Sequence, residues 1–561
     1  MPEFIKNVPR TKTVILLFFL LLITAMGLRL FLLFTSQHYL DGDESMVGLM
    51  SLHIIEKGEL PLFWYGIHYN GGGSWEAYIG SLFILLFGYS DISVKLSALF
   101  FSILILIFLY LWVKENFSDR MALLAMYFYV FSVSFIAWNL KLRGHLTLIF
   151  MMLVQLWIYY RFLFQDKKTL GYAAITGLLS GLAVWCLETS LLLMAIFFIF
   201  WYRQEKIFFL KKQFLIFCLT FFFGVIPLIR ENIIYNLANL KHLLGKGYIG
   251  IETRNFIERI YLLFIKDLPS IFHWNTIQVY PSELPWFVWV GYLIAIIATV
   301  NFLIRLWKPL KNWFLSSFSI KTQNILSMDY EKIVFIALYM FIFQIIFTFS
   351  NFSLIAPRYL LPIMPSIFLV LALFIDRLLN IKKNITRVFA WLILITWALT
   401  GMIVTYSVSK DFTVIDGFTE SYAPDLPRLV SELKSTGINR AYSEKFIQYR
   451  IIFYSREDII VSRFRNPRGG GVIGTPPFSM YPEYEKIVEN DHRNAAVIFG
   501  NQPQILRYFE DYLHSIDAVF KKSKIGGFTY YYNLKPIFDS GDFITFILNQ
   551  GYSPKELNKY L

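Results

Sequence analysis

The stretch TVILLFFLLLITAMGLRLFLLF, residues 13 to 34, decides the fold class of this chain. A helix of this length covers the roughly 30 Å of hydrocarbon in a lipid bilayer. Lys6, Arg10 and Lys12 precede it. The run is nevertheless longer than the apolar core of a signal peptide, and no small-residue cleavage site follows it. The sequence therefore predicts a retained membrane span at this position.

Apolar residues dominate the rest of the chain as well. Of its 561 residues, 56% are hydrophobic, 19% are aromatic and only 16% are charged, and the mean hydropathy is +0.53. The net charge of +13 could suggest nucleic acid, but most Lys and Arg lie in short clusters between apolar runs, where they orient a membrane protein. Cys186 and Cys218 lie within apolar runs and offer no disulfide framework or Cys-based zinc site. We therefore expect membrane lipids as partners and no nucleic acid.

Eleven apolar runs are candidate membrane spans, so the predicted fold is an α-helical polytopic membrane protein. The run at residues 189–202 is short for a span. The eleven runs lie near residues 13–34, 93–113, 121–138, 145–164, 171–187, 189–202, 213–229, 286–306, 332–350, 356–375 and 388–408.

The stretch at residues 75–87 is apolar but too short to cross unless it tilts or thins the bilayer, and it could instead lie in the interface. If it does not cross, the basic linkers between spans fall on the side of the N-terminus. The positive-inside rule then gives a cytoplasmic N-terminus. These linkers hold Lys114, Arg120, Arg161, Lys167, Lys168, Arg203, Lys206, Lys211, Lys212, Arg305, Lys308, Lys311, Lys321, Arg377, Lys382, Lys383 and Arg387, whereas the opposite short loops hold only Lys57, Lys141, Arg143 and Arg358.

With an odd number of crossings, the tail of the chain faces the extracytoplasmic side. Residues 1–408 form the predicted transmembrane domain, with outer loops at 35–92 and 230–285, and residues 409–561 form the tail. The tail alternates helix and strand patterns, which indicates a soluble α/β domain. Its linker NPRGGG, residues 466–471, lacks the Gly-Lys-Ser/Thr of a phosphate loop. Helices are predicted at 425–434, 445–454 and 504–514, and strands at 440–443, 458–461, 495–499 and 528–532.

The first outer loop begins with Tyr39-Leu-Asp41-Gly-Asp43-Glu44-Ser45, so three carboxylates lie next to the membrane. Asp41 and Glu44 have capping-box spacing, and Asp43 could cap a helix that runs from Glu44 to about Lys57. Capping does not require all three acids. Beside a low-dielectric wall a carboxylate can accept a proton from a hydroxyl, or the cluster could bind a divalent cation, Mg²⁺ or Mn²⁺, through oxygen ligands. The sequence leaves these two uses open.

Basic side chains recur at outer span ends, where the positive-inside rule disfavours them. They could bind a phosphate, although an isolated Arg can simply extend to the lipid headgroups. Arg143 and Arg358 are the stronger candidates because each abuts an apolar span. The candidates are Lys141, Arg143, His145, Arg230 and Arg358; Glu76 and Glu188 are further candidates that could instead serve a helix dipole or a turn.

Seven motifs, taken in order, resemble those of the GT-C glycosyltransferases, and most closely the bacterial relatives of the dolichyl-phosphate-mannose protein mannosyltransferases, glycosyltransferase family 39, which include aminoarabinose transferase-like members. The resemblance covers about residues 10–375. The motifs are Asp43-Glu44, Tyr65-Gly-Ile-His-Tyr-Asn70, Gly73-Ser-Trp-Glu-Ala-Tyr78, Leu86-Phe-Gly88, Lys95-Leu-Ser, Leu142-Arg-Gly-His145 and Pro357-Arg-Tyr-Leu-Leu-Pro362.

This resemblance implies a multi-span bundle with interfacial helices around an outer active site. It further implies transfer of a sugar from a polyprenyl-phosphate carrier to a lipid, glycan or protein acceptor, with inversion at the anomeric carbon, in the inner (plasma) membrane of a bacterium. Asp43 would be the catalytic base and Glu44 would position it or the acceptor. Arg143 and Arg358 would bind the leaving phosphate. Asp41, Glu76, His145, Arg230 and Tyr359 are the other expected substrate-binding residues.

Two positions depart from that family's pattern. The outer loop that often carries a second acid here reads Leu-Arg-Gly-His, and the related Lys-Pro-Pro is replaced by Gly71-Gly-Gly-Ser. Metal dependence and the acceptor therefore stay open. Two other functions are compatible with the sequence: a transporter or flippase for lipid-linked sugar, and a non-catalytic membrane subunit that binds glycan. Transporters usually carry ionisable residues in mid-span, whereas here the charges lie at the outer rim.

Overall fold

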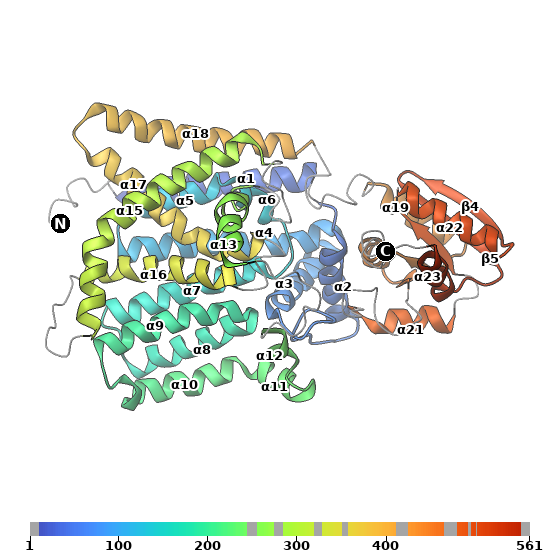
Figure 1. The fold of residues 1–561 in the computed structure, drawn as a ribbon, viewed down its shortest axis with the longest axis horizontal. Helices are drawn as coiled ribbons and strands as arrows, with labels where there is room; N and C mark the ends of the chain where they lie inside the picture. The colour runs from blue at the N-terminus through green and yellow to red at the C-terminus, as the bar shows by residue number, and fades with distance from the viewer. Residues whose placement is uncertain are drawn as a thin grey trace.

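The protein consists of a helical bundle with an α/β domain at one end (Figure 1). The computed structural model describes residues 11–36, 38–243, 255–273, 284–318, 328–349, 357–410, 424–464, 480–491, 495–500 and 502–550. The predicted linker at 466–471 and parts of the second outer loop, 230–285, lie outside these residues.

Seven described helices are long and apolar enough to cross a membrane, which makes the chain an integral membrane protein. With η6 (Pro357–Ile363), which leads into α17, they match seven of the predicted runs. They are α1 (Thr11–Thr35), α4 (Asp91–Asn116), α7 (His145–Phe164), α15 (Trp286–Phe318), α16 (Met328–Phe349), α17 (Met364–Asn380) and α18 (Asn384–Val408).

The other four predicted runs are also helical, but they are shorter or broken. Residues 121–138 divide into α5 (Asp119–Val130) and α6 (Val133–Trp138). Helix α8 (Leu170–Cys186) has 17 residues and α9 (Leu191–Gln204) has 14. Helix α10 (Lys212–Gly224) bends by 55° into α11 (Ile226–Ile234). Helices α8 and α9 lie alongside α7, and α10 lies alongside α8 (Figure 1), which agrees with a polytopic fold.

Small residues allow α8 and α10 to approach closely. A Cβ atom added at Gly181 would lie 2.4 Å from the carbonyl oxygen of Phe221, and one at Gly177 would lie 2.2 Å from that of Phe217. In membranes such close backbone packing replaces the missing hydrophobic driving force between helices. Shorter elements complete the bundle: η1 (Glu188–Ser190), η2 (Phe208–Leu210), α12 (Ala238–Leu243), α13 (Phe256–Leu262), η3 (Leu263–Asp267) and α14 (Leu268–Ser270).

The basic linkers between spans meet at one end of the bundle. Arg120 pairs with Asp376 at 3.1 Å, linking the start of α5 to the end of α17. Arg203 of α9 pairs with Glu331 of α16 at 3.2 Å. The α17–α18 turn lies at this same end, and the α/β domain lies at the opposite one (Figure 1). The described parts of the linkers that the positive-inside rule grouped on one side are therefore grouped in space.

Helices α2 (Gly42–Glu56) and α3 (Gly71–Phe87) lie at the end of the bundle that faces the α/β domain (Figure 1). At the start of α3, Gly72 packs against the backbone of Gly144. Just after its end, the Tyr89 hydroxyl donates to the carbonyl of Phe453 in the α/β domain at 2.7 Å. Both ends of α3 therefore lie at one end of the bundle, and the stretch at 75–87 does not cross.

The C-terminal domain contains a five-stranded sheet in the order β2-β1-β3-β5-β4. Strands β1 (Arg440–Ser443), β2 (Ile460–Arg463) and β3 (Ala496–Phe499) are parallel, and β4 (Val519–Ile525) and β5 (Phe528–Lys535) form an antiparallel hairpin. The predicted helices and strands are all present, with β2 starting two residues later than expected. The helices are α19 (Leu426–Ser435), α20 (Lys445–Ser455), α21 (Pro482–Asn490), α22 (Pro503–Ser515) and α23 (Ser540–Asn549).

Candidate active site

The acidic cluster forms the N-terminus of α2. The carboxylate of Asp41 accepts from the backbone N–H of Glu44 at 2.8 Å, and the carboxylate of Glu44 accepts from the backbone N–H of Asp41 at 3.0 Å. This is the capping box that the spacing predicts. The cap is Asp41, however, and the helix begins at Gly42. The interpretation of Asp43 as the cap is therefore wrong, because the Asp41–Glu44 pair already satisfies the free N–H groups.

Glu44 is fully buried and neutralised by a lysine of the bundle. Its Oε1 atom accepts from Lys95 Nζ at 2.6 Å and from the backbone N–H of Leu142 at 3.1 Å. Lys95 Nζ also donates to the carbonyl of Leu140 at 2.8 Å. Glu44 therefore connects α2, α4 and the loop before α7, and it has no exposed surface with which to touch a substrate. The sequence indicated Lys95 only as part of a motif, although a lysine near the outer end of an apolar span is itself a signal.

Asp41 is also engaged by cations. One of its carboxylate oxygens, Oδ2, lies 3.1 Å from Lys141 Nζ and 2.8 Å from Arg143 Nη2. Asp43 differs from both neighbours. Its side chain is 25% exposed, and it forms an ion pair with Arg143 Nη1 at 3.7 Å. Of the three clustered carboxylates, Asp43 alone is open to a second molecule.

Glu76 fixes the loop that carries Arg143. Its buried carboxylate accepts from the backbone N–H of Gly144 at 3.0 Å. Burial raises the pKa of the Glu76 carboxyl well above its usual range, and the Gly144 hydrogen bond opposes that rise. Asn70 donates to the carbonyl of Arg143 at 3.2 Å from the other side. Gly144 has a φ of +74° and lies against Asn70, so only glycine fits there without strain.

His145, Arg358 and Tyr359 form a second group of side chains, at the start of α7 and in η6. His145 is the first residue of α7, and its ring meets the ring of Tyr359 edge-on at 5.4 Å. The Arg358 guanidinium lies over the same tyrosine at 5.4 Å. Its buried Nε atom has no hydrogen-bond partner within the described part of the chain. His145 lies within electrostatic range of both Arg143 and Arg358, so the two predicted arginines are near one another at this end of the bundle.

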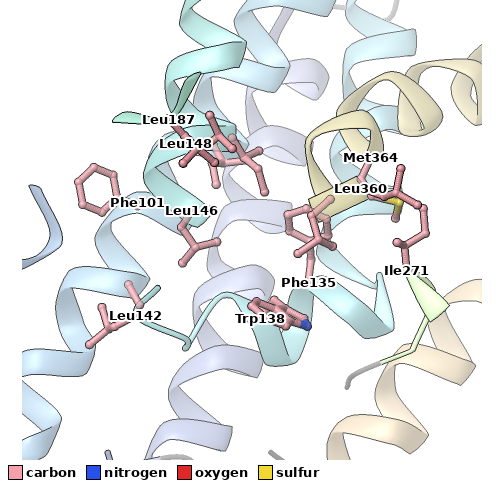
Figure 2. Close-up of a cluster of buried hydrophobic side chains, with 14 of the residues drawn as sticks. Phe101, Phe135, Trp138, Leu142, Leu146, Leu148, Leu187, Ile271, Leu360 and Met364 are labelled. Carbon is pink, nitrogen blue, oxygen red and sulfur yellow. The ribbon is translucent and has the colours of Figure 1, made fainter. Parts of the chain in front are cut away.

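Apolar side chains surround this end of the bundle (Figure 2). Phe135 lies between Trp138 of α6 and Leu360 of η6, close to Met364 of α17. Farther along the same view, Leu142 and Leu146 flank the turn into α7. All of these side chains are less than 4% exposed. The charged loop therefore rests on a packed apolar wall, where charges interact more strongly than in water.

Arg230 is separate from the cluster. It is exposed on α11, and within the described residues no hydrogen bond or ion pair joins it to the acidic cluster. The next residue, Glu231, instead pairs with His68 of the first outer loop at 2.7 Å. The predicted role of Arg230 in binding a phosphate stays a prediction. Glu188, a further candidate, accepts from Asn239 of α12.

The described residues do not fit a divalent cation. No group of three or more His, Cys, Asp or Glu side chains is close enough to hold a metal ion within the ranges given above. The oxygens of Asp41 and Glu44 that face the loop already accept from lysine and arginine nitrogens. A metal site at this cluster would require those ion pairs to break.

The sequence family described as dolichyl-phosphate-mannose-protein mannosyltransferase matches residues 75–230, from α3 to α11. ArnT from Cupriavidus metallidurans, bound to undecaprenyl phosphate, superposes with a TM-score of 0.58 at 11% identity, over 94% of this chain and 99% of that chain. The chain has the GT-C fold. A second GT-C structure is the archaeal oligosaccharyltransferase AglB from Archaeoglobus fulgidus, in complex with an inhibitory peptide and a dolichol-phosphate. It superposes with a TM-score of 0.53 at 12% identity, over 92% of this chain and 74% of that chain.

The GT-C fold extends through both parts of the molecule, because the superposition on ArnT includes nearly all of each chain. No protein of curated function matches the sequence. The family match contains Glu76, Lys95, Arg143 and His145, so it covers the loop that faces the acidic cluster. The resemblance to GT-C glycosyltransferases is therefore confirmed.

Proposed function

We propose that this chain is a membrane glycosyltransferase that moves a sugar from a polyprenyl-phosphate carrier to an acceptor on the extracytoplasmic face. The observation that carries the proposal is the difference in burial among three neighbouring carboxylates. Asp41 and Glu44 are buried against cations, whereas Asp43 is 25% exposed. The names of the similar structures support the choice of carrier, since one holds undecaprenyl phosphate and the other a dolichol-phosphate.

Asp43 serves as the general base in this proposal. The acceptor hydroxyl or amine attacks the anomeric carbon, its proton passes to the Asp43 carboxylate, and the bond from that carbon to the phosphate oxygen breaks. Attack opposite the leaving phosphate inverts the anomeric carbon. Arg143, whose Nη1 lies 3.7 Å from Asp43, orients the carboxylate before the reaction. The buried acids, Asp41 and Glu44, position this pair and do not touch the substrate.

The leaving phosphate binds between Arg143 and Arg358. A guanidinium stabilises the charge that develops on the leaving oxygen, and an apolar wall strengthens that interaction. Arg358 suits this role because its buried Nε lacks a hydrogen-bond partner among the described residues. Tyr359 lies beside it and packs edge-on against His145. Arg230 stays a prediction, because its exposed position on α11 places it outside this group.

The orientation follows from the grouped basic linkers. If they face the cytoplasm, the acidic cluster and the α/β domain face outward, where a lipid-linked sugar could meet its acceptor. A bacterial plasma membrane is our prediction for the location. We derive no step through a metal ion, because the Asp41 and Glu44 carboxylates are already paired with Lys and Arg.

Transfer of labelled sugar by the purified protein tests the proposal. Wild-type protein and its variants are incubated in lipid nanodiscs with a polyprenyl-phosphate sugar and a cell-envelope acceptor fraction. Asp43→Asn should lower kcat by about 10²- to 10⁴-fold, the usual contribution of a positioned general base. Its thermal unfolding should match wild type, because Asp43 is partly exposed and its nearest cation is 3.7 Å away.

The matched control is Glu56→Gln, a carboxylate on the same helix that pairs with Arg456 at the surface. This variant should keep full transfer activity. Undiminished transfer by Asp43→Asn would remove Asp43 from the mechanism. Translocation of the lipid by wild-type protein in proteoliposomes, with no sugar transfer, would instead favour a flippase.

A further inference from the structure

The C-terminal domain rests directly on the helix that carries the acidic cluster. Helix α20 packs along α2 in the same chain direction, because its contacts follow the same order along both helices. Arg450 meets Leu40, Phe453 meets Gly48, and Glu457, just after α20, meets His53. A Cβ atom at Gly48 would lie 2.4 Å from the Phe453 ring, so α20 seats closely against α2.

Two side chains of α20 hold the two segments of backbone that enter α2 and α4. Arg450 Nε donates to the carbonyl of Leu40 at 2.7 Å. The hydroxyl of Tyr454, which lies near the backbone of Leu40, donates to the carboxylate of Asp91, at the start of α4, at 2.9 Å. Arg450 is fully buried, so its contact is shielded from water. Leu40 and Asp91 of the membrane domain are thus held by side chains of the other domain.

Leu40 directly precedes the cap residue Asp41 and stands three residues before Asp43. A carbonyl that is held by a buried guanidinium restricts where the next residues can lie. The position of Asp43 therefore depends on the membrane bundle, through the pairs of Asp41 and Glu44, and also on α20. Displacing a catalytic group by about 1 Å can reduce a rate by about 10²-fold.

We infer that Arg450 and Tyr454 are positioning residues, through which the C-terminal domain holds Leu40 and Asp91 and so sets the place of Asp43. This inference rests on the proposed function for its effect on rate, but the structural part stands without it. The C-terminal domain is then part of the catalytic unit and is required for turnover even where the substrate does not touch it.

Two measurements on purified protein in nanodiscs test the inference. The first is hydrogen exchange of the peptide covering residues 38–46, which needs no substrate. The second is the kcat and the KM for a polyprenyl-phosphate sugar. Arg450→Gln and the milder Tyr454→Phe are compared with Arg456→Gln. Arg456 is on the same face of the domain and pairs with Glu56, but it is exposed and lies at the far end of α2.

We expect Arg450→Gln to speed exchange in residues 38–46 by about tenfold and to lower kcat by about 10- to 100-fold, with KM changed less than about twofold. Tyr454→Phe should show the same pattern at about a third of the size, and Arg450→Lys should recover part of the rate because it restores one donor. Arg456→Gln should behave as wild type.

The two readouts separate failure of the inference from failure of the proposed function. If wild-type protein transfers no sugar, the exchange result alone decides: faster exchange at 38–46 supports the positioning role, and unchanged exchange overturns it. If wild type is active, full kcat in Arg450→Gln and Tyr454→Phe overturns the inference. Should Arg450→Gln fail to fold, Tyr454→Phe decides, because it removes one hydroxyl and keeps the ring.

Discussion

The two ends of α2 carry opposite kinds of charge cluster. At the N-terminal end, buried acids face cations supplied by the membrane bundle. At the C-terminal end, more exposed charges face the α/β domain. The first set comprises Asp41, Asp43, Glu44, Lys95, Lys141 and Arg143; the second comprises His53, Glu56, Lys57, Glu59, Arg456 and Glu457.

Burial separates what the two clusters can do. Lys95 and Glu44 are 1% and 0% exposed, so removing one charge would leave the other unpaired in an apolar wall. Arg456 and Glu56 are 59% and 38% exposed, and such surface pairs contribute little. The N-terminal end therefore needs every partner in place and leaves Asp43 available, whereas the C-terminal end serves to join two domains.

The largest effect should come from breaking the buried pair. Glu44→Gln and Lys95→Met should each destabilise the protein by about 3–5 kcal/mol, because each leaves an uncompensated buried charge. Thermal unfolding in one detergent, followed for wild type and both variants, measures this loss.

The double variant is the control for that experiment. With both charges removed, Glu44→Gln combined with Lys95→Met should regain at least half of the lost stability, because no buried charge remains alone. If either single variant unfolds at the wild-type temperature, the pair does not hold the N-terminal end together.

The Glu44–Lys95 pair also bears on how much of the structure can be predicted from the sequence. Hydropathy and the positive-inside rule predicted the spans, the non-crossing helix at 75–87 and the α/β tail, because each depends on a local pattern. The breaks at α5–α6 and α10–α11 were not predictable from hydropathy, since both halves of each run are apolar. In the tail, α21, β4 and α23 were not predicted; α21 and β4 are short and rich in charged residues.

The site was predicted in its residue types but not in its pairings. Capping-box spacing joined Asp41 to Glu44, which are neighbours in the chain. No local pattern links Glu44 to Lys95, 51 residues away, or Leu40 to Arg450, 410 residues away. The distinction between Asp43 and its neighbours is a matter of tertiary burial, so it became visible only in the fold.

A second prediction concerns binding of the donor phosphate near the N-terminal end of α2. Arg358→Gln should raise the KM for the polyprenyl-phosphate sugar by about 10- to 100-fold, since a charge-assisted hydrogen bond to phosphate is worth about 1.5–3 kcal/mol. Steady-state transfer at varied donor concentration measures it, with binding of undecaprenyl phosphate alone as a check that needs no chemistry.

Arg230→Gln is the matched control, because it removes the same group from an exposed position outside the cluster. Its KM should stay within about twofold of wild type. An equal rise in KM in the two variants would mean that the donor phosphate also contacts α11. The predicted role of Arg230 would then be supported, and a phosphate site limited to Arg143 and Arg358 would be wrong.

The smallest effect should come from the C-terminal end of α2. Burial opposes ionisation of Glu457, but hydrogen bonds from His53 and Lys57 outweigh it and lower the pKa of Glu457 to about 2. A carboxyl whose pKa is lower in the folded state stabilises the protein above its unfolded pKa of about 4.3, and this stabilisation is lost as the pH falls toward 2. We expect about 1–2 kcal/mol, since the group is partly exposed and screened.

Glu457→Gln isolates that contribution. The variant should unfold at a lower temperature than wild type at about pH 6, and the difference should shrink at about pH 3, where the wild-type carboxyl begins to take up a proton. Glu432→Gln, a change of the same kind on α19, should show no such convergence. A gap that stays constant between the two pH values would show that Glu457 acts by packing alone, and the C-terminal end of α2 would then not be joined to the α/β domain by charge.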